Sequence, residues 1–145
     1  MSMFCYQCEQ TSRSTGCTAY GVCGKDPETA ELQDLLNYLA KGISQYAYRA
    51  RLLGAVDSEV DRFVVQALFT TVTNVNFDPN SLAAFIRRGV GIRSRAKDLY
   101  EQAAIATGKS PETPAGPAQY VIADDRADMI RQSITIGIEG RLHRF

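Results

Sequence analysis

Several absences narrow the classes of protein to which this chain of 145 residues can belong. Sixteen basic residues balance sixteen acidic ones, whereas nucleic-acid binders usually carry a basic excess. No stretch approaches the roughly 20 consecutive apolar residues that span a bilayer. The N-terminus lacks the basic region and apolar run of a secretory signal. The sequence therefore predicts a cytoplasmic protein that binds neither nucleic acid nor membrane.

Motifs of common catalytic sites are also missing. We find no phosphate-binding G-x-x-x-x-G-K-[ST] loop, no G-x-G-x-x-G after a strand and no nucleophile–base pair. The single histidine, His143, lies close to the C-terminus, where an exposed residue without a role is expected. One run of basic residues comprises Arg87, Arg88, Arg93, Arg95 and Lys97. We predict that it is a solvated helix face, and docking of an acidic partner is the alternative.

Three long segments place apolar residues at steps of three and four, the period of an amphipathic helix. The first follows Asp26-Pro27-Glu28, a capping residue with a proline at the first helical position, and should end at Gly54. The third follows Asp78-Pro79 and ends near Gly108, and Gly89 and Gly91 in its middle predict a bend or a close helix contact. The second begins after Asp57 or Ser58 and carries a predicted core stripe of Val60, Phe63, Val64, Ala67, Leu68, Thr71, Val72 and Val75.

Short connections between these helices favour antiparallel neighbours. The sequence therefore predicts an all-α fold: an up-down-up three-helix bundle preceded by a Cys-rich loop, plus a partial C-terminal helix. We expect residues 1–108 to form the loop and the bundle, and the proline-containing residues 109–124 to form an irregular connector. Residues 125–145 are expected to be a helical segment that resembles the truncated start of a second domain.

All four cysteines precede residue 24, as Cys5, Cys8, Cys17 and Cys23. Disulfides that stabilise a fold should be spread through the chain, because they act by closing loops, and they rarely persist in a cytoplasm. Clustering at one end therefore predicts a shared metal centre.

The spacing of the cysteines bears on which metal they bind. Structural zinc and cubane iron–sulfur clusters both use four thiolates. The irregular x2, x8, x5 spacing favours the larger cluster. Glycines beside the ligands let backbone N–H groups approach the sulfurs: Gly16, Gly21 and Gly24. A zinc ion, and disulfides or free thiols, stay open as alternatives.

Four runs around and after the cysteines carry a family resemblance: Met3-Phe4-Cys5-Tyr6-Gln7-Cys8-Glu9-Gln10-Thr11, Thr15-Gly16-Cys17-Thr18, Gly21-Val22-Cys23-Gly24-Lys25 and Leu32-Gln33-Asp34-Leu35-Leu36. They closely resemble the N-terminus of the hybrid cluster protein family, also called prismane protein or hydroxylamine reductase. The resemblance implies that Cys5, Cys8, Cys17 and Cys23 hold a [4Fe–4S] cluster, which passes electrons to a second, hybrid cluster. It also implies that hydroxylamine is reduced to ammonia, or nitric oxide to nitrous oxide, at that second cluster.

One departure from the family limits what the chain does alone. Family members are several times longer and hold the hybrid cluster through residues of later domains, whereas this chain has no cysteine after Cys23. We therefore expect an iron–sulfur electron-transfer module, truncated, split or freestanding, that lacks the catalytic domains of the oxidoreductase. Its expected partner is a redox protein or the missing hybrid-cluster domains. A zinc-stabilised structural or interaction domain and a cluster-based redox sensor are the alternatives.

Overall fold

The computed structural model describes residues 3–73 and 78–141, and these residues are mainly helical. They contain no β-strand, only an isolated antiparallel bridge between Cys5 and Cys17. The predicted all-α class is therefore confirmed, and no helix within these ranges is long and apolar enough to cross a membrane. The elements are η1 (Ser12–Ser14), α1 (Pro27–Leu52), α2 (Ser58–Thr73), α3 (Pro79–Ala106), η2 (Gly116–Ala118), α4 (Arg126–Ile136) and α5 (Ile138–Arg141).

The helix starts follow from local capping. The Asp26 carboxylate accepts the Thr29 N–H at 2.7 Å before α1, and Asp78 accepts the Asn80 N–H at 3.1 Å before α3. Each cap is followed by a proline, whose missing N–H costs nothing at this position. These two predicted starts are confirmed.

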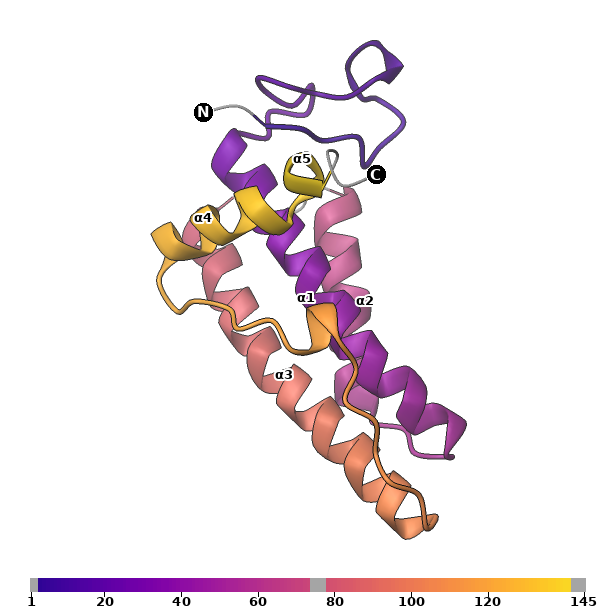
Figure 1. Cartoon of the computed structure of the whole chain (residues 1–145). Coiled ribbons are helices and arrows are strands. Elements are labelled where there is room, and N and C mark those ends of the chain that lie inside the picture. Colours follow the sequence, from indigo (N-terminus) through magenta and orange to yellow (C-terminus); the bar gives the residue numbers. More distant parts are fainter. Residues whose placement is uncertain (1–2, 74–77, 142–145) are drawn as a thin grey trace.

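Helices α1, α2 and α3 form the predicted bundle, and α4 lies across the N-terminal half of α1 (Figure 1). The Cys-rich segment covers the end of the bundle at which α1 begins (Figure 1). The predicted C-terminal helix is broken at Gly137, between α4 and α5. His143 and Val75 lie outside the described residues, and the division into domains stays a prediction.

The predicted core stripe of α2 is too wide. Phe63, Ala67 and Thr71 are buried as expected, whereas the side chains of Leu68 and Val72 are 48% and 54% exposed. The reason is geometric, because α1 and α3 pack against only one side of α2. Within residues 3–73 and 78–141 no segment covers the opposite side. Four exposed apolar side chains lie there, and we call them the α2 face: Val65, Leu68, Phe69 and Val72.

Gly89 lies where α3 closely approaches α1 and α2, as predicted, and Gly91 does not. A Cβ atom at Gly89 would lie 2.6 Å from both Phe63 Cζ and Leu39 Cδ2, two side chains that are fully buried, whereas one at Gly91 would meet nothing within 4 Å.

We expect Gly89→Ala to lower the free energy of unfolding by about 1–3 kcal/mol through overpacking. Gly91→Ala is the matched control and should raise it by about 0.5–1 kcal/mol through helix propensity. Urea denaturation of both variants checks this, and equal effects would contradict it.

Asp57 joins the start of α2 to the middle of α3. One carboxylate oxygen accepts the Glu59 N–H at 2.9 Å, and the other pairs with Arg95 Nε at 2.5 Å. The Arg95 guanidinium, followed by the Glu59 N–H, holds the pKa of Asp57 below its usual value against the opposing effect of burial. The stabilisation is therefore complete above the unfolded-state pKa and disappears as the pH falls through the lower folded-state pKa.

We expect Asp57→Ala to lower the free energy of unfolding at pH 7 by about 1 kcal/mol, the usual cost of a lost helix cap. The difference from the parent chain should stay constant above about pH 5 and shrink at more acidic pH, since the usual aspartate pKa is about 3.9. Asp57→Asn keeps a cap oxygen without the charge and serves as the control. Urea denaturation between pH 3 and 7 measures all three, and a difference that grows on acidification would refute the assignment.

Candidate metal centre

Two backbone arrangements organise the Cys-rich segment. Cys5 and Cys17 exchange hydrogen bonds, since the Cys5 N–H donates to Cys17 O at 3.0 Å and the Cys17 N–H donates to Cys5 O at 2.8 Å. Further along, a tight turn begins where the Gly21 N–H donates to Lys25 O at 2.8 Å. A Cβ atom at Gly21 would lie 2.9 Å from Lys25 Cβ and 3.1 Å from Cys23 Sγ, so the turn requires glycine there.

All four cysteines line one small cavity between these arrangements. None of them is in a disulfide. Cys17 is buried, Cys5 and Cys8 are half-buried and Cys23 is exposed. The fold thus brings together the four residues that the sequence singles out, although they are up to 18 positions apart (from 5 to 23).

The cavity has a volume of about 20 Å³, which is about the space of one water molecule. Residues 3–73 and 78–141 contain no group of three or more His, Cys, Asp or Glu side chains arranged to hold a metal ion. The four-cysteine ligand set stays a prediction.

The donors around Cys17 favour its thiolate form. The Ser12 N–H points at Cys17 Sγ at 3.4 Å, and the Thr11 hydroxyl lies 3.8 Å from the same sulfur. The N–H groups of Ser12 and then Val22 lower the pKa of Cys17, and together with Thr11 and Lys25 they outweigh burial, which raises it. Because metals and clusters bind the thiolate, these residues fit an iron–sulfur cluster, whose sulfurs accept N–H hydrogen bonds.

Lys25 is a residue of this site that the sequence reasoning missed. Its side chain is only 1% exposed, and its ammonium donates to Cys5 Sγ at 3.6 Å. A lysine this deeply buried is rare unless it is paired. The signal in the sequence was its position two residues after Cys23, but a lysine beside a turn is exposed in most proteins, so its burial could not be foreseen.

Each cation of the basic run on α3 has a partner within the described chain, and docking of an acidic partner stays an untested alternative. Arg95 pairs with Asp57 and Glu59, and Lys97 pairs with Glu101. Arg87 and Arg93 donate to the backbone oxygens of Asp124 and Pro117, and the Arg88 guanidinium lies over the rings of Phe63 and Phe85. These cations therefore mainly hold α2, the connector and the start of α4 against α3.

Comparison with known proteins yields a family match and several relatives. The model of the Prismane/CO dehydrogenase family matches residues 3–132. The chain is 49% identical over 140 residues to a protein of Geobacter sulfurreducens named hydroxylamine reductase, an alignment that covers 95% of this chain and 26% of that protein. A protein of the same name from Rhodospirillum rubrum is 48% identical, over 97% of this chain and 26% of that protein. Another from Methanocella arvoryzae is 53% identical, over 94% of this chain and 24% of that protein. The chain thus spans about a quarter of the length of these relatives.

Proposed function

The chain belongs to the Prismane/CO dehydrogenase family, and on that premise we propose that it is the iron–sulfur electron-transfer part of a hydroxylamine reductase. The ligands are Cys5, Cys8, Cys17 and Cys23, and the group that they hold is a [4Fe–4S] cluster. When bound, such a cluster accepts and releases one electron at a time. The residues that complete the catalytic site belong to the three quarters of the relatives' length that this chain does not cover.

One observation carries the proposal: four free cysteines line one cavity in which hydrogen-bond donors point at the sulfurs. None of the four sulfurs bridges another, so all four are available as ligands. The chain supplies ligation, N–H donors and partial burial, the factors by which a protein tunes a cluster. In this role no side chain has to act as an acid, base or nucleophile.

Anaerobic purification tests the proposal directly. We expect the chain to be brown, with broad visible absorption and close to four iron and four acid-labile sulfide per chain, and to show an electron paramagnetic resonance signal on reduction. One zinc and no sulfide per chain would refute the proposal and support a zinc-stabilised structural or interaction domain instead.

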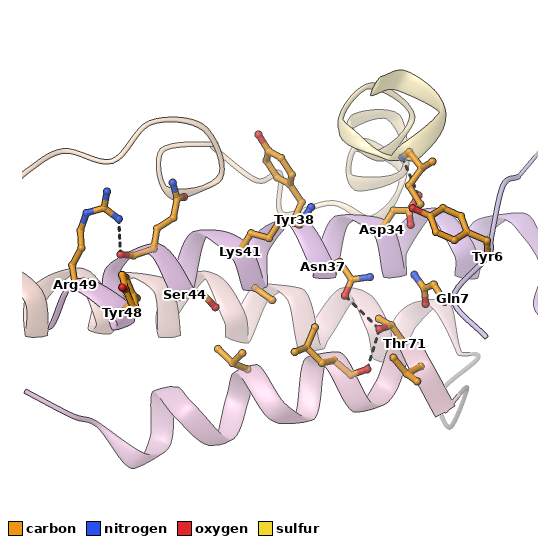
Figure 2. A pocket seen from close by; sticks show the side chains of 16 residues that line it. Tyr6, Gln7, Asp34, Asn37, Tyr38, Lys41, Ser44, Tyr48, Arg49 and Thr71 are labelled. Atoms are coloured by element: carbon orange, nitrogen blue, oxygen red, sulfur yellow. Dashed lines mark hydrogen bonds between the residues drawn. The ribbon is translucent and has the colours of Figure 1, made fainter. Parts of the chain in front are cut away.

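We propose that the partner docks in a groove between α1 and α2, over the α2 face. The groove has a volume of about 730 Å³, and Leu68 and Val72 contribute to its lining. Figure 2 shows Gln7 and Thr71 at one end of the groove and Tyr48 and Arg49 at the other. The occupant is the polypeptide that corresponds to the uncovered part of the relatives, because an apolar face of this kind marks an interaction site and that polypeptide is about three times the length of this chain.

Gln7 connects the groove to the cysteine cavity. It stands between Cys5 and Cys8 in the sequence, and it lines both the groove and the cavity. Its Oε1 atom is buried and, among the described residues, has no hydrogen-bond partner. Most buried acceptors have a donor, from protein or from ordered water, and we propose that the partner in the groove supplies this one. A partner in the groove would therefore reach the cysteine site at Gln7, which suits electron transfer.

A further inference from the structure

Lys25 differs from the other residues that line the cysteine cavity. Among the described residues there, it alone has a charged side chain. Its ammonium is 3.6 Å from the Sγ atom of Cys5, a residue whose backbone is paired with that of Cys17. The side chain is 1% exposed, so bulk water screens this charge poorly.

The backbone at Lys25 is tied to two neighbouring elements. Lys25 accepts the Gly21 N–H through its carbonyl, and its Cβ packs where a side chain on residue 21 would otherwise lie. The next residue, Asp26, is the cap of α1. Lys25 is therefore anchored on both sides, by the turn that carries Cys23 and by the first turn of α1, and its side chain is directed into the cavity.

We propose that Lys25 is a positioning residue that raises the reduction potential of the centre held by the four cysteines. The inference rests on the proposed function. Reduction adds one negative charge to a group that four thiolates already make negative, and a fixed cation stabilises the reduced form more than the oxidised form. Net charge and hydrogen bonds to the sulfurs are the factors that set such potentials.

Removal of the charge tests the inference. In the anaerobically loaded chain, we expect Lys25→Gln to lower the equilibrium constant for one-electron reduction about tenfold, a shift of the midpoint potential by about 59 mV to more negative values. Lys25→Arg keeps the charge and should stay close to the parent chain. The control is Lys109→Gln, which removes the same charge from an exposed residue beyond the C-terminal end of α3, opposite the Cys-rich segment (Figure 1). Redox titration followed by visible absorption gives each midpoint.

Each outcome decides the inference. An unchanged midpoint in Lys25→Gln, or an equal shift in Lys25→Arg, overturns it while the iron–sulfur assignment stands. If Lys25→Gln loses iron and sulfide but Lys25→Arg retains both, the cluster content supports a role for the positive charge. If both variants lose iron and sulfide, the inference is overturned and Lys25 has a packing role. A parent chain without iron and sulfide overturns both the inference and the proposed function.

Discussion

Replacement of Cys17 by serine is expected to remove nearly all iron and acid-labile sulfide from the chain, a drop of more than tenfold per chain. Cys17 is the most buried of the four cysteines, and its sulfur receives the Ser12 N–H. A serine hydroxyl in its place is neutral at pH 7, whereas the iron of a cluster binds the thiolate form of cysteine. Iron and sulfide analysis and the visible spectrum of the anaerobically purified variant measure the loss.

The helical bundle should survive this substitution. The core of α1, α2 and α3 forms one apolar cluster, and Cys17 belongs to a separate small cluster with Met3 and Ala30. We therefore expect the far-ultraviolet circular dichroism of Cys17→Ser to match that of the parent chain. The control is Thr18→Ser, a change at the adjacent exposed residue, which should retain iron and sulfide. Full retention of both by Cys17→Ser would remove Cys17 from the ligand set.

The second large effect concerns catalysis by the assembled enzyme. We expect the isolated chain not to reduce hydroxylamine. Activity should appear when it is mixed anaerobically with a polypeptide that corresponds to the remaining three quarters of the Geobacter sulfurreducens relative. Leu68→Glu should lower the restored activity at least tenfold, because a carboxylate buried unpaired in an apolar contact carries a large desolvation penalty.

A matched substitution separates docking from a general effect of charge. Ile105 is another exposed apolar residue, near the end of α3 and outside the α2 face, and Ile105→Glu should leave the restored activity unchanged. The docking assignment is wrong if the two variants restore activity equally. Hydroxylamine reduction by the isolated chain would instead contradict the proposal that the covered quarter lacks the catalytic residues.

Much of the fold could be predicted because its signals are local. Asp26 and Asp78 cap α1 and α3 through N–H groups two or three residues away, and the prolines after them need no partner elsewhere in the chain. The period of the apolar residues likewise records which side of each helix faces a core. The width of the buried arc is not local, and for this reason the assignment of Leu68 and Val72 to the core was wrong.

The sequence by itself determined the helical class, the helix starts and the choice of four cysteines as the candidate ligands, since capping, periodicity and clustering of one residue type are all properties of neighbouring positions. Only the tertiary structure decided that Lys25 is buried against Cys5 Sγ, that Gln7 lines both the cavity and the groove, and that the α2 face is uncovered in the described chain. Burial depends on which segments meet in space, and a turn or helix surface carries no local mark of the segment that packs against it.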